Sequence, residues 1–120
     1  MTKRIKRLNS LLKEVISEVI RDDVRNPQVS KLTTVTEVDI SKDLQHAKVY
    51  ISVIGTEQER TTTIEALESA SGFIGVYASK KVVMRHFPTL TFRLDTSVDK
   101  QMKIDMILRK IYEEKEHRHD

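Results

Sequence analysis

The chain has 120 residues, enough for one ordinary domain, and its 38% hydrophobic and 32% charged residues exclude both a membrane protein and a disordered chain. No apolar run approaches the ~18 residues of a transmembrane helix, and the N-terminus lacks the apolar block of a secretory signal, so we expect a cytoplasmic protein. Cysteine is absent, which excludes disulfides, thiolate zinc sites and cysteine nucleophiles.

The net charge of +3 is distributed unevenly along the chain. Residues 1–21 hold six basic residues against two acidic ones, and residues 72–94 hold four basic residues and no acidic one. The intervening residues 22–71 hold five basic residues against nine acidic ones. Two separate basic blocks indicate a polyanionic partner, with RNA or DNA as the leading candidates. The alternative is that surface lysines only keep the protein soluble.

Apolar residues recur at spacings of three and four along residues 2–21, which predicts an amphipathic helix with Thr2 as its N-cap. The opposite side of that helix is basic, and its first acidic residue is Glu14. The basic residues on that side are Lys3, Lys6, Arg7, Lys13 and Arg21, with Arg4 on the flank. The helix therefore has one apolar side and one cationic side.

Pro27 breaks this helix, and the β-branched run that follows predicts a strand over residues 29–40. A short turn at residues 41–43 leads into residues 47–54, where apolar and polar residues alternate. The two runs predict an antiparallel hairpin that ends at Gly55.

A second helix is predicted over about residues 59–69, and its apolar spacing continues past an interruption at Gly72. The resulting third helix is expected to end at Pro88, because proline pushes the preceding residue out of helical geometry. A third strand at residues 90–94 and a last helix at residues 98–111 complete an α+β pattern. A three-stranded sheet is not stable unless its apolar face is buried, so we expect helices to pack on one face of the sheet.

Signatures of enzymes and metal sites are missing from this sequence. The three glycines cannot form a P-loop or a dinucleotide fingerprint. His117 and His119 lie two residues apart without the further ligands that a metal site needs. Paired carboxylates such as Asp22 and Asp23 lie at a helix end with no sign of burial. We therefore expect no enzyme activity, no cofactor and no metal.

Small residues at 70–75 separate the second and third helices. Such a junction lets an RNA backbone approach closely, as the GXXG loop of KH domains does. Gly72 and Gly75 match that loop, but Phe73 and Ile74 between them continue the apolar stripe, which favours core positions for both and a helix kink at Gly72. If the backbone at Gly72 is left-handed, alanine there strains the junction by up to about 1 kcal/mol.

Three segments in order resemble the ribosome-binding factor A family. Residues 35–49, Val-Thr-Glu-Val-Asp-Ile-Ser-Lys-Asp-Leu-Gln-His-Ala-Lys-Val, are similar to its hairpin motif. Residues 70–73, Ala-Ser-Gly-Phe, are similar to its interrupted-helix motif, in which Ala-X-Gly replaces the KH loop. Residues 85–95 match its Arg-X-X-Pro-X-Leu-X-Phe-X-X-Asp segment. One departure is Gly75, where members of that family often carry a basic residue.

The resemblance implies a type II KH-like fold and a factor without enzymatic activity. Such a factor binds the free small ribosomal subunit through 16S rRNA and assists its late maturation, including 5′-end processing. We expect one domain over residues 1–112, a flexible charged tail over residues 113–120, and a monomer with neither a membrane partner nor a small-molecule substrate.

We expect the cations of the two basic blocks to hold RNA phosphates, with two small junction residues allowing close approach. The expected RNA-binding residues are Lys3, Arg4, Lys6, Arg7, Lys13, Ser71, Gly72, Lys80, Lys81 and Arg85. The phenylalanines have core spacing and only Tyr50 lies on an outward strand face, so base stacking is expected to be minor. One alternative is an adaptor that docks its last helix on a partner protein. Another is a small enzyme with an unrecognised acid or base site.

Overall fold

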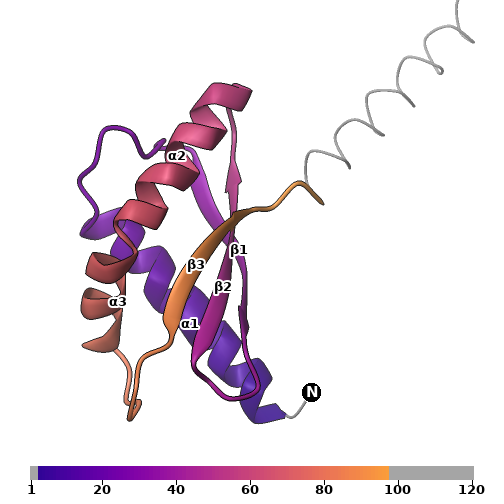
Figure 1. The fold of residues 1–120 in the computed structure, drawn as a ribbon, viewed down its shortest axis with the longest axis vertical. Helices are drawn as coiled ribbons and strands as arrows, with labels where there is room; N and C mark the ends of the chain where they lie inside the picture. The colour runs from indigo at the N-terminus through magenta and orange to yellow at the C-terminus, as the bar shows by residue number, and fades with distance from the viewer. Residues whose placement is uncertain (1–2, 98–120) are drawn as a thin grey trace, which may run out of the picture.

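The computed structural model describes residues 3–97 as one sheet with helices packed against it (Figure 1). In chain order the elements are α1 (Lys3–Asp22), β1 (Thr33–Ile40), β2 (His46–Val53), α2 (Glu57–Ser69), α3 (Ser71–Ser79) and β3 (Thr89–Leu94). β1 runs antiparallel to β2, and β3 runs parallel to β2 on its other side. The α+β class and the KH-like order are confirmed through β3, while the expected helix 98–111 and tail 113–120 lie outside the described residues.

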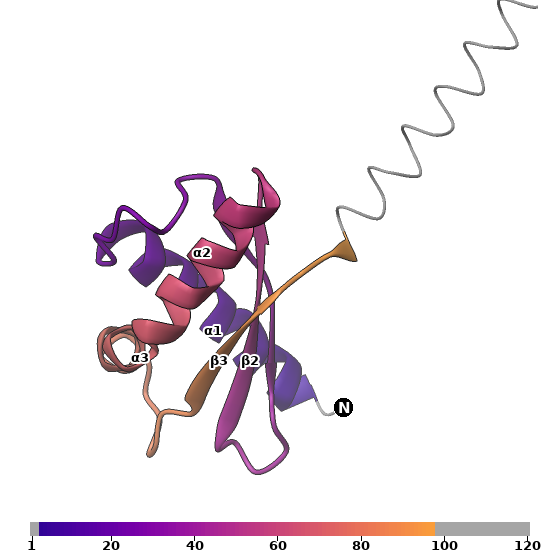
Figure 2. The ribbon, with the colours of Figure 1, turned by 45° about the horizontal axis from the view of Figure 1, so that its top comes forward.

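One face of the sheet forms the core. Alternate residues of β2 are buried, namely Ala47, Val49, Ile51 and Val53, as a strand that is covered on one face requires. In both views of the ribbon α1 runs behind the strands (Figures 1 and 2), and it also contacts α3. The helices therefore cover one face of the sheet and leave the other open, as the sequence predicts.

α1 packs on the sheet through one stripe of aliphatic side chains. The buried residues are Leu12, Val15, Ile16, Val19 and Ile20, and burying each one stabilises the fold by about 1.5–3 kcal/mol. The helix ends where the backbone amides of Asp23 and Val24 both donate to the carbonyl oxygen of Val19, at 2.8 and 3.1 Å. Neither α1 nor any other helix within residues 3–97 is long and apolar enough to cross a membrane.

β1 begins at Thr33, four residues after the predicted start of the strand. The backbone before it bonds elsewhere: the amide of Gln28 donates to Asn26 Oδ1 at 2.9 Å, and the amide of Ser30 donates to Thr63 Oγ1 at 3.2 Å. The first bond is local and the second ties the segment to α2, so neither amide pairs with β2. The β-branched run alone could not indicate this, because strand propensity yields to tertiary hydrogen bonding.

The break between α2 and α3 lies at Ala70, so the prediction of a kink at Gly72 is wrong by two residues. α2 begins at Glu57, where Thr56 and Glu59 form a capping box. Gly72 lies in the first turn of α3, and within residues 3–97 Gly55 is the only glycine with a positive φ. The left-handed backbone on which a strain from alanine at Gly72 would depend is therefore absent.

α3 ends at Ser79, nine residues before Pro88, so the prediction that Pro88 closes this helix is also wrong. The hydroxyl of Ser79 donates to the carbonyl oxygen of Val76 at 2.7 Å, at the last turn of the helix. Residues 80–88 then form an irregular connection to β3, and the side chain of Val83 is fully exposed on it. Consecutive β-branched valines in this segment lower its helix propensity well before the proline.

Candidate nucleic-acid interface

The two basic blocks meet at a groove of about 500 Å³ between the first turns of α1 and the segment that follows α3. The turn between β1 and β2 also contributes to its wall. The lining residues are Arg4, Arg7, Leu8, Leu11, Asp43, Leu44, Gln45, Val83, Met84, Arg85 and His86. We call this site the Arg4–Arg85 groove. The expected convergence of the two blocks is thus realised for Arg4, Arg7 and Arg85.

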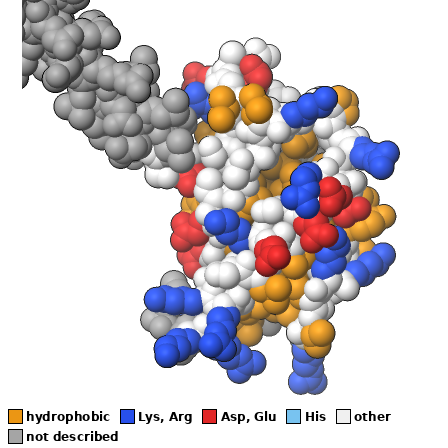
Figure 3. Space-filling view, turned by 180° about the vertical axis from the view of Figure 1, so that it is seen from behind, with side chains coloured by type: hydrophobic (Ala, Val, Ile, Leu, Met, Phe, Trp, Pro, Cys, Tyr) orange, Lys and Arg blue, Asp and Glu red, His pale blue; other side chains and the backbone are white. Residues whose placement is uncertain are grey.

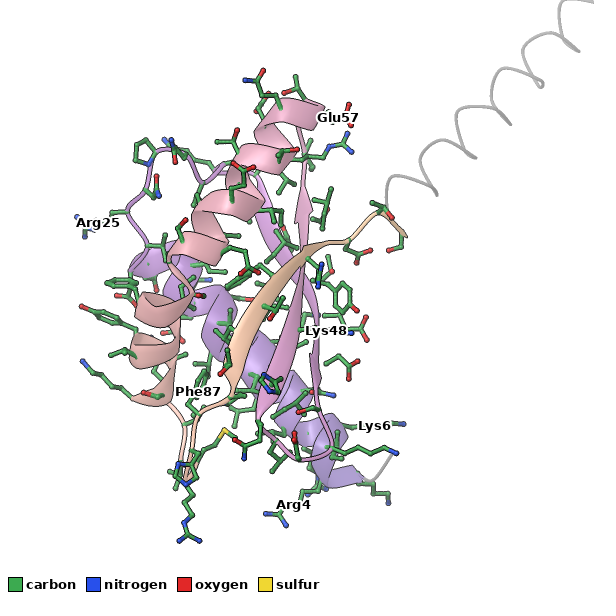
Figure 4. All side chains as sticks on the ribbon, in the orientation of Figure 1. Arg4, Lys6, Arg25, Lys48, Glu57 and Phe87 are labelled. Carbon is green, nitrogen blue, oxygen red and sulfur yellow. The ribbon has the colours of Figure 1, made fainter. Side chains whose placement is uncertain are left out.

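α1 contributes one stripe to the groove, because residues at positions 4, 7, 8 and 11 share a helix face. Leu8 is partly buried against the core, whereas Leu11 is 42% exposed. Leu11 does not belong to the buried stripe of α1 that packs on the sheet. An apolar side chain on the exposed side of a helix indicates a second contact surface. Figure 4 shows Arg4 extending beyond the end of the molecule, while Lys6 points to a different side.

The segment 80–88 is held in place by apolar side chains that pack against the core. Met84 and Phe87 are partly buried against the core. The Phe87 ring packs close to α3, since a Cβ added to Gly75 would lie 3.9 Å from Cδ2 of Phe87. Figure 4 shows Phe87 between α3 and β3. Arg85 therefore extends from an anchored connection, which limits the conformational entropy that it loses on binding.

Positive charge dominates the groove. Among residues 3–97 no carboxylate forms an ion pair with Arg4, Arg7 or Arg85, and all three are exposed. Asp43 is the only acidic lining residue; its carboxylate accepts hydrogen bonds from Ser41 Oγ at 2.6 Å and from the Gln45 amide at 3.0 Å. Those bonds lower the pKa of Asp43, so it remains a carboxylate at neutral pH. Three guanidinium groups then outnumber one carboxylate, an arrangement suited to phosphate.

Lys and Arg side chains are spread over the face seen from behind the molecule (Figure 3). Lys and Arg side chains gather there beside the N-terminal end, and acidic side chains join them towards the middle of the same face. This change matches the sequence of α1, in which Glu14 is the first acidic residue. The N-terminal half of α1 is therefore purely cationic on its surface, whereas its C-terminal half carries charges of both signs.

Lys6 and Lys13 lie on another flank of α1. Each is one helical turn from Asn9, whose Oδ1 accepts a hydrogen bond from the amide of Ile40 in β1 at 2.9 Å. They therefore face the β1 side of the helix and do not line the Arg4–Arg85 groove. Lys3 is exposed at the first residue of α1 and does not line the groove either.

The remaining expected residues are also separated from the groove. Lys81 Nζ is 2.9 Å from Glu18 Oε1, and this hydrogen bond raises the pKa of Lys81. Lys80 Nζ lies 4.9 Å from the centre of the Tyr77 ring. Ser71 and Gly72 are at the opposite end of α3, which is about 13 Å long at the usual helical rise. The structure thus divides the ten predicted residues among several surfaces.

Phe73 corrects a sequence-based interpretation. Ile74 is fully buried as expected, but the Phe73 side chain is 43% exposed, so its assignment to the core is wrong. Two adjacent helical residues point about 100° apart, and α3 directs Ile74 and Ala78 inward. Tyr50, expected to face outward, is half-buried.

A second groove of about 870 Å³ lies at the other end of α1, below the connection to β1. Its lining includes three cations, Arg21, Arg25 and Lys31. Arg21 differs from the groove arginines because its Nε lies 3.1 Å from Asp22 Oδ1. Within residues 3–97 no cluster of three side chains suitable for a metal ion occurs at either end.

The chain is similar to known proteins over most of its length. The model of the family "Ribosome-binding factor A" matches residues 4–108. The ribosome-binding factor A of Protochlamydia amoebophila is 66% identical over 115 residues, which cover 96% of this chain and 88% of that protein. The crystal structure of ribosome-binding factor A from Thermus thermophilus has a TM-score of 0.67 and 28% identity, covering 75% of this chain and 94% of that one. A homology model of the Thermus thermophilus factor, as fitted into a cryo-EM map of a 30S complex with it, has a TM-score of 0.61 and 26% identity, covering 73% and 91%.

Proposed function

The chain belongs to the ribosome-binding factor A family, and we propose that it binds the small (30S) ribosomal subunit by holding phosphates of 16S rRNA at the Arg4–Arg85 groove. One observation carries the proposal: Arg4, Arg7 and Arg85 come together from both basic blocks, and no carboxylate among residues 3–97 forms an ion pair with them. The cryo-EM complex of the 30S subunit with the Thermus thermophilus factor supports the same partner.

The binding chemistry follows from the side chains. A guanidinium donates in a planar fork to phosphate oxygens, and phosphate binding releases counterions from the RNA. Neutral lining residues such as Leu11 and Val83, both exposed, fit the sugar edges between phosphates. Lys3, Lys6, Lys13 and Lys80 extend the attraction over neighbouring surfaces at longer range.

Binding alone is enough for a role in maturation. A protein that binds one rRNA conformation better than others stabilises that conformation by its differential affinity, with no chemical step. In this proposal the factor acts without enzymatic activity on a late precursor of the subunit, and 5′-end processing of 16S rRNA proceeds from the conformation that it stabilises.

Two matched variants of the full chain test the proposal. Arg4, Arg7 and Arg85 are changed to Gln in one variant; Arg21, Arg25 and Lys31 are changed to Gln in the other, so both lose the same charge. At about 1 kcal/mol or more for each charged contact, the groove variant should bind small subunits about a hundredfold more weakly in co-sedimentation. The control variant should bind within about twofold of wild type, and thermal unfolding of the groove variant should not change.

If both variants lost the same affinity for small subunits, the groove would be refuted as the interface. Binding would then depend only on the net charge of the protein. Equal binding to intact subunits and to their RNA-stripped proteins would instead favour the adaptor function. For the maturation step, the 5′ ends of 16S rRNA are mapped in cells that depend on each variant. The groove variant should accumulate extended 5′ ends and the control variant should not.

A further inference from the structure

The outer face of α3 carries an aromatic pair that the core does not use. Phe73 is 43% exposed and Tyr77 is 36% exposed, while Ile74 and Ala78 on the inner face are fully buried. The ring centroids of Phe73 and Tyr77 lie 4.4 Å apart with the ring planes inclined by 36°. The residues are one helical turn apart, so the helix itself fixes the two rings together.

This face belongs to the most peripheral helix of the described fold. α3 lies at the outer margin of the molecule in both ribbon views (Figures 1 and 2). Val76, between the two rings in sequence, is 56% exposed. Large aromatic side chains that remain exposed together are typical of contact surfaces, because their burial gives more free energy than that of smaller residues.

A cation accompanies the rings. Lys80 Nζ lies 4.9 Å from the centre of the Tyr77 ring, and no carboxylate among residues 3–97 pairs with it, in contrast to the adjacent Lys81. α3 itself contains no acidic residue. The face therefore offers the exposed Phe73 ring and, over the neighbouring Tyr77 ring, an uncompensated ammonium group, which match the base and the phosphate of one nucleotide.

We propose that Phe73 and Tyr77 form a stacking site for an unpaired RNA base, with Lys80 beside them to hold the adjoining phosphate. The base must be unpaired, because bases inside a duplex do not expose their faces to side chains. This inference rests on the proposed function and adds a second kind of contact to it. The groove binds phosphates of any RNA, whereas the rings on α3 bind only an unpaired base and therefore favour single-stranded RNA.

The position of the site relative to the groove fits one continuous ligand. Lys80 and Arg85 are five positions apart in the same connection, so their Cα atoms lie no more than about 18 Å apart even when it is fully extended. The ion pair between Lys81 and Glu18 fixes the beginning of that connection to α1. A strand that leaves the groove therefore reaches α3 along this connection.

A tryptophan probe tests the stacking directly. The chain contains no tryptophan, so Phe73→Trp in the full chain gives a single tryptophan, which can be excited selectively and retains an aromatic face on α3. Single-stranded oligoadenylate should quench the fluorescence of this variant strongly. A duplex of the same length should bind through phosphates and quench it little. Equal quenching by both RNAs, or no quenching by bound oligoadenylate, would overturn the stacking site.

Binding measurements on a second pair of variants complete the test. Phe73→Leu with Tyr77→Leu keeps an apolar helix face but removes both ring faces, and Val76→Leu on the same face is the matched control. The double variant should bind oligoadenylate about tenfold more weakly, with the control unchanged. A double variant that binds like wild type refutes the stacking site, while the groove variants decide the proposed function separately. Loss of binding to RNA-stripped subunit proteins would show that the face docks a protein, and would also overturn the proposal.

Discussion

The grooves at the two ends of α1 are each lined by three Lys or Arg side chains, but the ion pairing of these cations differs. At the N-terminal end, Arg4 and Arg7 line a groove together with Arg85, and none of the three has a carboxylate partner among residues 3–97. At the C-terminal end a larger groove of about 870 Å³ holds Arg21 next to Asp22 at 3.1 Å. A cation that already has a carboxylate gains less from a phosphate, because the existing pair must first be broken. Within residues 3–97 the Arg4–Arg85 groove thus has three unpaired cations, whereas in the larger groove one of the three cations already has a carboxylate partner.

Single substitutions within the second basic block sharpen this comparison. Arg85 is unpaired in the groove and Lys81 is paired with Glu18, although only four positions separate them. Arg85→Gln should weaken binding to small subunits about fivefold, since one charged contact is lost. Lys81→Gln should change it less than about twofold. Equilibrium binding of labelled variants measures both, and a larger effect of Lys81→Gln would contradict the role of pairing.

Each end of the molecule also holds a carboxylate of lowered pKa. Asp43 lies in the groove, whereas Asp95 follows β3 at the other end and accepts hydrogen bonds from Thr36 Oγ1 and Ser97 Oγ, both at 2.6 Å. Hydrogen bonds from Ser97 and Thr36 lower the pKa of Asp95. Its contribution to stability is therefore present above the unfolded pKa near 3.8 and is lost as the pH falls through the folded value.

Asp95→Asn should consequently lower the free energy of unfolding by about 1 kcal/mol at pH 7. The difference from wild type should shrink as the pH falls below about 4, where the wild-type carboxylate is also neutralised. Denaturant melts across that pH range test the expectation, and binding to small subunits at neutral pH should stay unchanged. A difference that grows on acidification would show that the sign is wrong.

Alanine substitutions at two glycines should give the smallest changes in stability. They test the junction between α2 and α3 at Gly72 and the loop before α2 at Gly55. Nothing lies within 4 Å of a Cβ placed on Gly72, and its φ is not positive, so Gly72→Ala should stabilise the protein by up to about 1 kcal/mol. A Cβ on Gly55 would lie 2.8 Å from Glu59 Oε2 in the capping box, so Gly55→Ala should destabilise it. Thermal melts distinguish the two, and a destabilised Gly72→Ala variant would restore a special backbone role for that glycine.

Sequence reasoning succeeded where one physical rule decided the outcome. The apolar period of α1 and the alternation of β2 follow from burying one face, and both elements were predicted within a few residues. The end of α3 was missed because no glycine or proline marks it, and only a gradual loss of helix propensity separates Ser79 from Pro88.

The site was predicted less completely than the fold, for a physical reason. The first helix directs both flanks away from the core, so its period alone cannot tell that Arg4 and Arg7 face residues 83–86 while Lys6 faces β1. Which flank of the helix faces which neighbour is decided by how the helix packs on the sheet and on the segment after α3. The same holds for Phe73, since either of two adjacent apolar residues in α3 satisfies the period and only one of them can face the sheet.

The salt dependence of binding counts the phosphates that the groove contacts, because each phosphate contact adds a fixed increment to the slope of log affinity against log salt concentration. Wild type should give a slope of roughly −3 to −5, and changing Arg4, Arg7 and Arg85 together to Gln should flatten it by about 2 to 3. The same number of Gln substitutions at Arg21, Arg25 and Lys31 should leave the slope as in wild type. Parallel lines for wild type and the groove variant would contradict the account, because the three arginines would then contact no phosphate.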